Sequence, residues 1–221
     1  MPQLLIASQK PAKLFIVNCS LFIDNGGSAM HFILDIGNVL IDFKPEKFLR
    51  SLLNDPPGED RMNRLIFQGP EWVKLDEGRI TQEEALAIFL AKEPLHQELT
   101  KKVMDNLTGL LTPIPETIAL LPRVKMAGHG LYFLSNYHDK LRHYILARYP
   151  FFSLFDGGVF SCDVHITKPA AGIYTCLLDQ YRLKPEDCLF FDDMAPNTAA
   201  AERLGMRAVL FSGAGDIERF L

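Results

Sequence analysis

The sequence predicts an α/β fold, in which a Rossmann-like parallel sheet carries helices on both faces and accepts one all-helical insertion. Five short apolar runs have the length and composition of buried strands. Amphipathic stretches separate the later runs, and this alternation favours a parallel sheet. Residues 44–115 interrupt the alternation, because they show helical patterns and no strand-like run.

The predicted strands are nearly devoid of polar residues. They are Phe32–Asp35, Gly130–Leu134, Gly157–Ser161, Cys188–Asp192 and Arg207–Phe211. Four of the five are almost continuously apolar, as is typical of strands that helices cover on both faces. The sheet is therefore expected to lie between two layers of helices.

Helical patterns occur both in the intervals between these strands and within the insertion. Those of the core are Asp139–Tyr149, Ile173–Tyr181 and Pro196–Leu204, and those of the insertion are Glu46–Leu53, Asp60–Phe67, Thr81–Ala91 and Leu95–Leu107. Thr81 and Glu84 have the spacing of a capping box, which indicates a helix start. Pro113 and Pro115 indicate the return of the chain to the core.

Composition excludes several classes of partner. The 221 residues suffice for one domain with an insertion, and 48% of them are apolar. The formal net charge is −4 and no basic cluster occurs, so nucleic acid is not an expected partner. No apolar run approaches the roughly 20 residues of a membrane span, so no membrane partner is expected. Nothing in the sequence determines the oligomeric state.

The cysteines indicate a reducing compartment. Cys19, Cys162, Cys176 and Cys188 form neither a CxxC pair nor a zinc-binding pattern. We expect them to be free thiols, and we expect the protein to be cytoplasmic.

Residues 1–29 precede the first predicted strand and carry no recognisable motif. Polar residues such as Asn18 and Asp24 interrupt their apolar runs, unlike in a signal peptide. We interpret residues 1–29 as an N-terminal extension that is dispensable for activity. Met30, directly before the first strand, is a candidate for the true initiator.

Polar residues stand at the carboxyl ends of three predicted strands. Asp35 ends the first strand, Ser135-Asn136 follow the second, and Asp192-Asp193 end the fourth, while Lys168-Pro169 opens a helical stretch. Ligands of such sheets bind beyond the carboxyl ends of the strands. Burying a carboxylate without partners is costly. Acidic, hydroxyl, amide and lysine side chains at one edge therefore indicate a metal and phosphate site.

These residues resemble the four motifs of the haloacid dehalogenase-like superfamily in order and spacing. Asp35–Val39 resembles the first motif, Ser135-Asn136 the second, Lys168-Pro169 the third, and Asp192-Asp193 with Asn197 the fourth. Each motif alone is common, but the four together are a strong signal.

The resemblance runs from residue 31 to the end of the chain. It implies a division into an α/β catalytic core, residues 30–43 and 116–221, and a helical cap of the superfamily's first type, residues 44–115.

The resemblance also implies an enzyme, a phosphatase that hydrolyses phosphoric monoesters through an aspartyl-phosphate. Asp35 would be the catalytic nucleophile, since a carboxylate can attack phosphorus. Lys168 would neutralise the carboxylate and phosphate oxygens. Ser135 and Asn136 would bind the phosphoryl group together with Lys168.

Mg²⁺ is the expected cofactor, because hard divalent ions prefer oxygen ligands. Two adjacent carboxylates also repel one another without a cation. Asp35 and Asp193 would bind the metal directly, Asp192 would bind it or orient its waters, and the carbonyl of Gly37 would add a contact. Asn197 would support this loop.

Gly37 departs from the pattern of many phosphatases of the superfamily, which carry a general acid–base aspartate at this position. Such catalysis contributes roughly 10²–10⁴-fold. Either another residue performs it, or the leaving group needs little help. Asp42 and His138 are the nearest candidates in sequence, although we expect His138 to be a solvent-exposed helix-start residue. We also expect a turn that depends on the conformational freedom of Gly37.

Two further segments narrow the resemblance. Asp35–Asp42 resembles bacterial phosphatases that act on glucose 1-phosphate, and Trp72–Thr81 fits the same branch. A small phosphorylated metabolite, such as a sugar phosphate, is therefore the expected substrate. The alternatives are a metal-independent 2-haloacid dehalogenase, for which a bulky aromatic residue is expected at position 37, and a catalytically weak binding or regulatory protein.

Overall fold

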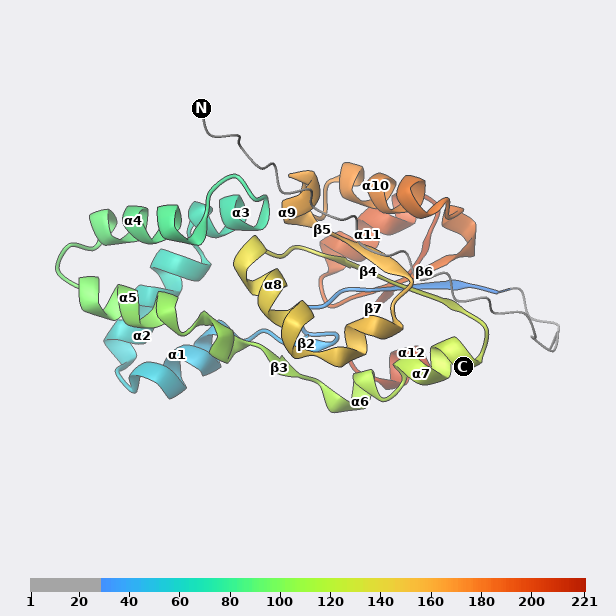
Figure 1. Ribbon diagram of the computed structural model, residues 1–221, viewed down its shortest axis with the longest axis horizontal. Helices are drawn as coiled ribbons and strands as arrows, with labels where there is room; N and C mark the ends of the chain where they lie inside the picture. The colour runs from blue at the N-terminus through green and yellow to red at the C-terminus, as the bar shows by residue number, and fades with distance from the viewer. Residues whose placement is uncertain (1–28) are drawn as a thin grey trace, which may run out of the picture.

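A five-stranded parallel sheet forms the centre of the molecule, as predicted (Figure 1). The computed structural model describes residues 29–221, so residues 1–28 of the predicted extension, including Cys19, lie outside the described part. The strands are β1 (His31–Leu34), β4 (Gly130–Ser135), β5 (Gly157–Phe160), β6 (Cys188–Asp192) and β7 (Arg207–Leu210). Each of them begins and ends within one residue of its predicted limits.

The order of the strands is β5-β4-β1-β6-β7, which places β1 at the centre. The register aligns Leu34 of β1 with Phe133 of β4 and Phe191 of β6. Since all three strands are parallel, the polar residues that follow them meet at one edge of the sheet.

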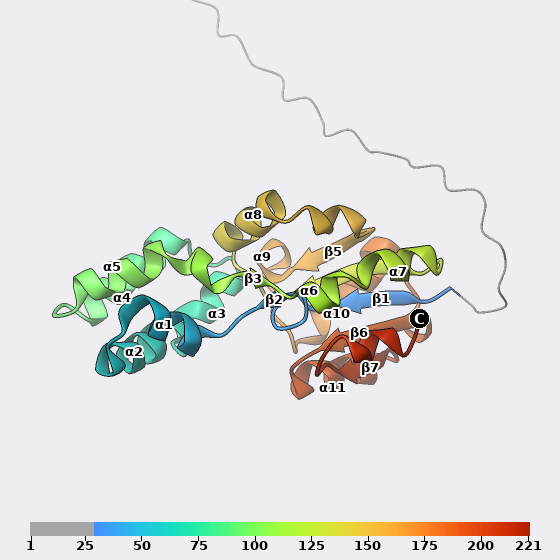
Figure 2. The same ribbon diagram turned by 90° about the horizontal axis from the view of Figure 1, so that it is seen from below.

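Helices cover both faces of the sheet (Figures 1 and 2). The helices of this part are α6 (Pro115–Ile118), α7 (Leu121–Met126), α8 (Asp139–Arg148), α9 (Ser161–Val164), α10 (Ala171–Tyr181), α11 (Ala195–Arg203) and α12 (Gly215–Glu218), with short 3₁₀ turns at Pro150–Leu154 and Pro185–Asp187. Phe32 and Leu34 face a core cluster that includes α7, α8 and α12, whereas Ile33 faces a second cluster with α10 and α11. This alternation explains why Phe32, Ile33 and Leu34 of β1 are all apolar.

The inserted helices gather at one end of the molecule (Figure 1). They are α1 (Pro45–Leu53), α2 (Pro56–Met62), a π-helical turn (Asn63–Phe67), α3 (Pro70–Asp76), α4 (Gln82–Lys92), α5 (Gln97–Asp105) and a 3₁₀ turn (Leu107–Leu110). The predicted capping box is confirmed, because Thr81 N donates to Glu84 Oε2 at 2.8 Å and Glu84 N donates to Thr81 Oγ1 at 3.1 Å.

Helix α3 was absent from the elements predicted from the sequence. Its seven residues are too few to show a helical period, although Pro70 at its first turn after Gly69 is a recognised helix-start signal. Its omission matters, because α3 carries two residues of the candidate site.

The prediction that residues 44–115 contain no strand is wrong at one point. Strand β3 (Thr112–Pro113) pairs antiparallel with β2 (Ile41–Asp42), aligning Ile41 with Pro113. Strands of two residues have no pattern of their own and are defined only by their pairing. They lie where the chain leaves and re-enters the core, and the division into core and cap domains stays a prediction.

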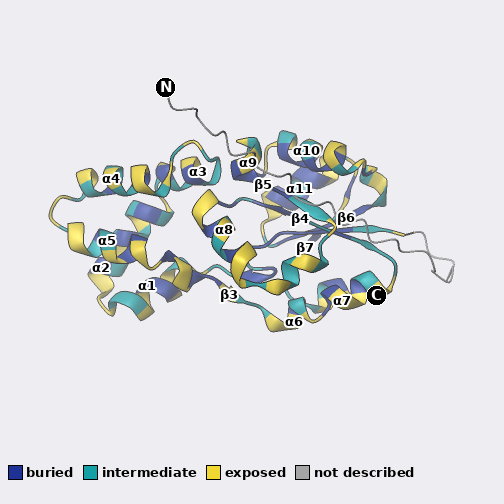
Figure 3. Cartoon of the chain, in the orientation of Figure 1, coloured by how far each residue is buried: buried dark blue, intermediate teal, exposed yellow. Residues whose placement is uncertain are grey.

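Burial follows the layered arrangement (Figure 3). The central strands β4, β1 and β6 are largely buried, while exposed residues lie along the outer faces of the helices. Cys162, Cys176 and Cys188 are free thiols, as predicted. Within residues 29–221, no helix is both long and apolar enough to cross a membrane.

Candidate active site

Asp35 directly follows β1, and its carboxylate is held from two sides. Asp35 N donates to Phe191 O of β6 at 2.9 Å, which continues the strand pairing by one residue. Asp35 Oδ1 accepts from Ile36 N at 2.7 Å and lies 2.8 Å from Lys168 Nζ. The side chain is almost fully buried. Its position is therefore set by the central strand and by one lysine.

Lys168 links two carboxylates. Its ammonium lies 2.8 Å from Asp35 Oδ1 and 2.6 Å from Asp192 Oδ2, and it donates to Leu134 O at 2.9 Å. Lys168 is also buried. Burial alone would lower its pKa, but Asp35 and Asp192 outweigh burial and leave the pKa of Lys168 above its usual value. The ammonium therefore stays charged between the two carboxylates.

Asp192 is fully buried and its oxygens are already in use. Asp192 Oδ1 accepts from Met194 N at 2.8 Å and from Asn197 Nδ2 at 2.9 Å, and Oδ2 accepts from Lys168. Asn197, in the first turn of α11, thus holds Asp192 rather than pointing to solvent. Asp192 has less freedom to bind a ligand than its neighbour Asp193.

Asp193 is more open and completes an acidic cluster. Its Oδ2 accepts from Asn38 Nδ2 at 2.9 Å, while Asn38 Oδ1 accepts from Phe43 N at 2.9 Å. Oxygens of Asp35, Asp192 and Asp193 lie within 4.8 Å of one another. Such a set of carboxylate oxygens has the chemistry and spacing for a hard divalent cation.

Ser135 and Asn136 lie at the end of β4, opposite Lys168. Ser135 is buried and lines the same cavity as Asp35. Asn136 holds the backbone of Lys168 by two hydrogen bonds, Lys168 N to Oδ1 at 2.7 Å and Nδ2 to Lys168 O at 3.0 Å. The amide of Asn136 is therefore committed to placing Lys168.

The turn after Asp35 does not depend on Gly37. The residue with positive φ is Asn38, at 53°, and Gly37 is not in that region. A Cβ at position 37 would meet only Phe43 Cβ, at 3.9 Å, which is an ordinary contact. The expectation that this turn needs a glycine at position 37 is wrong, because the left-handed residue is the next one.

A cavity of about 200 Å³ opens in front of Asp35. The sheet edge contributes the polar residues described above, and α3 contributes Trp72 and Asp76. Phe43 and Leu141 add apolar surface. All the site residues predicted from the sequence line this cavity, except Asp192, which lies behind Lys168.

Burial and the neighbouring charges shift the pKa of Asp35. Burial raises the pKa of Asp35 to about 6, Lys168 opposes the rise, and Asp192 adds to it. A bound cation would lower that pKa again, since it favours the carboxylate.

Two predictions about the missing acid are corrected. Asp42 does not line the cavity, because its carboxylate pairs with Lys44 at 2.6 Å on the surface of β2. His138 does line it, and the expectation that it is exposed is wrong, since Trp72 packs on its ring. Both ring nitrogens of His138 lack a hydrogen-bond partner among the described residues.

Asp76 is the site residue that sequence reasoning missed. It ends α3 and lines the same cavity as Asp35. The sequence feature that could have indicated Asp76 is an acidic residue two positions before Gly78, in the segment Leu75–Ile80. Without α3 in the predicted elements, nothing placed this carboxyl at the sheet edge.

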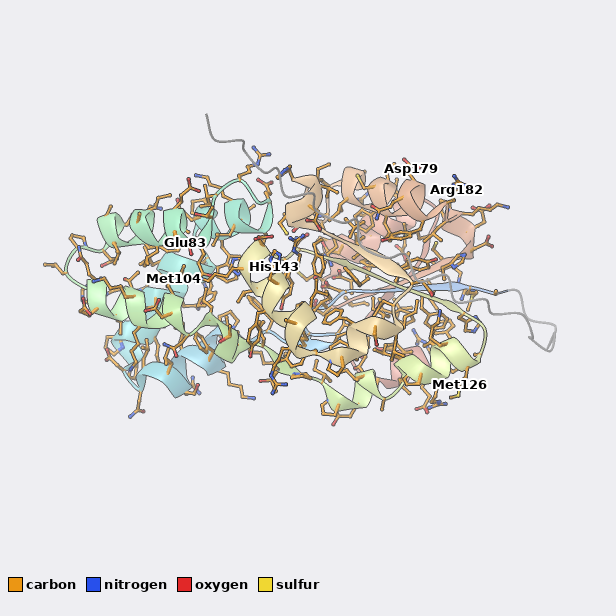
Figure 4. The ribbon with its side chains drawn as sticks, in the orientation of Figure 1. Glu83, Met104, Met126, His143, Asp179 and Arg182 are labelled. Carbon is orange, nitrogen blue, oxygen red and sulfur yellow. The ribbon has the colours of Figure 1, made fainter. Side chains whose placement is uncertain are left out.

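A second, larger cavity of about 560 Å³ adjoins the first at His138. Glu83 of α4 and His143 of α8, both labelled in Figure 4, belong to its lining. Lys140 lies 3.2 Å from Glu83 across it. This cavity is lined mainly by polar and charged side chains.

The sheet order, the four polar segments at its edge and the helical insertion define a hydrolase of one class. The chain belongs to the haloacid dehalogenase-like hydrolase family, whose model matches residues 29–205. It is therefore a hydrolase that uses this fold.

Three known proteins show the range of its relatives. Sesquiterpene phosphatase astK of Aspergillus oryzae is 24% identical over 174 residues, which cover 79% of this chain and 85% of astK. Drimenol cyclase drtB of Aspergillus calidoustus is 24% identical over 202 residues, 86% of this chain, and the match spans 35% of drtB.

The third is a solved structure, a HAD family enzyme from Bacteroides thetaiotaomicron. It gives a TM-score of 0.69 at 17% identity and covers 88% of this chain and 98% of that one. Its wild-type complex with magnesium and inorganic phosphate gives a TM-score of 0.65 at 16% identity, with coverage of 88% and 100%. Identities this low show a common fold.

Proposed function

We propose that this protein is a Mg²⁺-dependent phosphatase that hydrolyses phosphoric monoesters of small metabolites through an aspartyl-phosphate on Asp35. The observation that carries the proposal is the position of Lys168 Nζ, 2.8 Å from Asp35 and 2.6 Å from Asp192 at the wall of one cavity. A lysine there can hold the nucleophile and a phosphate oxygen at once.

Asp35 is placed for nucleophilic attack. The hydrogen bond from Ile36 N and the contact with Lys168 fix the carboxylate at the cavity wall. Attack on phosphorus forms a bond from Asp35 to the phosphoryl group and releases the alcohol, and water then hydrolyses the aspartyl-phosphate. Ser135, buried beside Asp35, would donate to a phosphoryl oxygen.

The charge balance of the site supports Mg²⁺ as the cofactor. With Asp35, Asp192 and Asp193 ionised and Lys168 protonated, three negative charges and one positive charge leave a formal charge of −2. Asp35 and Asp193 would hold the cation, with the carbonyl of Gly37, while Asp192 orients Lys168 and Asn197. The cation would neutralise the phosphate oxygens as the substrate approaches. The Bacteroides enzyme, which has a similar fold, forms a complex with magnesium and inorganic phosphate, and this supports Mg²⁺ as the cofactor.

The cavity lining supports two kinds of small phosphorylated substrate. Phe43 and Trp72 provide flat aromatic faces, on which a sugar ring or an isoprenoid chain can pack. The sequence resemblance favours sugar phosphates as substrates. The similarity to sesquiterpene phosphatase astK favours isoprenoid phosphates. Both belong to the class of small phosphorylated metabolites.

The experiment is release of inorganic phosphate from a panel of hexose, isoprenoid and aryl phosphates, with Mg²⁺ and with EDTA. We expect turnover that requires Mg²⁺ and is lost in Asp35→Asn. Asp42→Asn is the matched control, because Asp42 follows the same strand–turn segment but lies outside the cavity. Phosphatase activity that survives in Asp35→Asn would refute the nucleophile, and turnover of 2-haloacids in EDTA would establish the dehalogenase instead.

A further inference from the structure

Gly37 cannot transfer a proton, yet the alcohol released from a phosphate ester needs one. Six titratable groups line the cavity: Asp35, Asp76, Tyr137, His138, Lys168 and Asp193. The proton donor must stand in this cavity, because it has to reach the ester oxygen as the bond to phosphorus breaks.

Three of these groups already have other contacts or roles. Asp35 is the nucleophile of the proposed reaction. Lys168 is held by three acceptors between 2.6 and 2.9 Å, and Asp193 belongs to the acidic cluster and accepts from Asn38.

The pKa values of two more groups make them poor proton donors for the leaving group. Burial raises the pKa of Tyr137 far above its usual value, so Tyr137 releases its proton reluctantly. Burial lowers the pKa of His138 to about 4, so its imidazole is neutral near pH 7 and has no ready proton to give.

Asp76 remains, and its surroundings differ from those of the other carboxyls. Neither oxygen of its carboxyl takes part in a hydrogen bond or ion pair with the described residues, although the residue is at most partly exposed. It stands on α3, whereas Asp35, Lys168 and Asp193 belong to the sheet edge. If the phosphate of a substrate lies against the sheet edge, a group on α3 at the other side of the cavity would face its leaving group.

The backbone around Asp76 is anchored to the core. Ser161 Oγ of α9 donates to Asp76 O at 2.5 Å, and the ring of His165 contacts Glu77 O at 2.8 Å. Gly78, at φ 60°, approaches Cys162 so closely that a Cβ would meet Cys162 O at 2.7 Å. The end of α3 is therefore held in one place over the cavity.

We propose that Asp76 is the general acid–base of this enzyme, supplied by the insertion in place of the residue missing at position 37. The inference rests on the phosphatase function proposed above. As Asp35 attacks phosphorus, the ester P–O bond breaks, its electron pair stays on the leaving oxygen, and Asp76 gives that oxygen its proton. The Asp76 carboxylate then takes a proton from the water that attacks the aspartyl-phosphate, which restores Asp76 and Asp35 and releases phosphate.

The ionisation of Asp76 agrees with this role. Burial raises the pKa of Asp76 to about 8, Asp35 and Glu77 add to the rise, and Lys168 opposes it. Catalysis by a positioned acid is efficient when its pKa lies near the working pH.

The test compares the full-length protein, Asp76→Asn and Glu77→Gln on phosphate esters of graded leaving-group pKa, with saturating Mg²⁺. Glu77→Gln is the matched control, because it makes the same carboxyl-to-amide change at the next residue, which pairs with Arg79 and lies outside the cavity. We expect Asp76→Asn to lose roughly 10²–10⁴-fold in kcat on alkyl phosphates and little on dinitrophenyl phosphate, whose leaving group needs no proton.

The outcomes separate this inference from the function it rests on. An equal loss on all esters, or an unchanged dependence on leaving-group pKa, would overturn the role of Asp76 while leaving the phosphatase intact. A loss on alkyl phosphates in Asp76→Asn, with dinitrophenyl phosphatase activity kept in that variant but absent from Asp35→Asn, would support both proposals. Absence of that activity from the unaltered protein would refute the phosphatase itself, and the inference with it.

Discussion

The indole of Trp72 packs on the imidazole of His138, with ring centroids 5.2 Å apart and planes inclined by 37°. This contact joins α3 of the insertion to the first residue before α8 of the core. It also buries a histidine whose two nitrogens have no partner among the described residues, directly between the two cavities.

The buried imidazole should make the fold sensitive to acid. Burial lowers the pKa of His138 from 6.5 to about 4, so between these values the unfolded chain binds a proton that the folded chain excludes. Stability is then lost as the pH falls from about 6.5 to about 4. We expect His138→Phe to remove this loss and to raise the melting temperature most near pH 4, as thermal unfolding followed by circular dichroism would show.

The control for that measurement is His143→Phe, at an exposed position of α8. If the melting temperature changes with pH in the same way in both variants, His138 is not the cause of the acid sensitivity.

Because His138 lines both cavities, KM should change in His138→Phe if substrate uses its nitrogens.

Asp76 should have the opposite dependence on pH. Its pKa is raised from 3.8 to about 8, so the folded chain holds a proton that the unfolded chain releases, and stability is lost as the pH rises through this interval. Asp76→Asn should therefore gain stability over the unaltered protein between pH 4 and pH 8 in EDTA. Each kcal/mol corresponds to about 2–4 °C in a chain of this size. A gain that does not grow with pH would show that Asp76 is ionised in the fold.

Lys168 should be needed for stability as well as turnover. Lys168→Met leaves Asp35 and Asp192 buried without their cation, and breaking a buried pair in this way costs about 3–5 kcal/mol. Urea unfolding in EDTA measures the loss. Adding Asp192→Asn should restore part of the stability and none of the activity, whereas strictly additive losses would argue against direct coupling of the two side chains.

Positions 37 and 38 should respond differently to alanine. Gly37→Ala meets only Phe43 Cβ at 3.9 Å, so we expect a change in stability below about 0.5 kcal/mol. Asn38→Ala strains a residue at φ 53° and removes contacts to Asp193 and Phe43 N, which should cost about 1–3 kcal/mol. Urea unfolding and Mg²⁺ titration of both variants check this, and equal losses would contradict the placement of the turn at Asn38.

The sheet could be predicted because each strand carries its own signal. Phe32, Ile33 and Leu34 are all apolar because successive side chains of the strand enter the core clusters on opposite faces of the sheet. The positions of Asp35, Ser135 and Asp192 follow from the same signal, because parallel strands end at one edge. Three of the four site segments could therefore be brought together from strand positions, and the fourth, Lys168-Pro169, was added by the family resemblance.

What the sequence did not reveal depends on contacts between distant segments. The pairing of Ile41 with Pro113 leaves no local pattern, and α3 is too short to show a period. Trp72, which packs on the ring of His138, belongs to that unrecognised helix. The role of Asp76 was hidden for the same reason, since only the position of α3 brings its carboxyl to Asp35.

The contacts that build this site also determine when it can exist during folding. Asn38 and Asp193, which hydrogen bond at 2.9 Å, are 155 positions apart, and Asn136 and Lys168 are 32 apart. Contacts of such sequence separation are formed only after long loops have closed. A partly folded chain with β1 and β4 paired but β6 still free would have the nucleophile without Asp192 and Asp193. Recovery of Mg²⁺-dependent turnover after dilution from denaturant would thus report completion of the whole sheet, later than the return of helical signal.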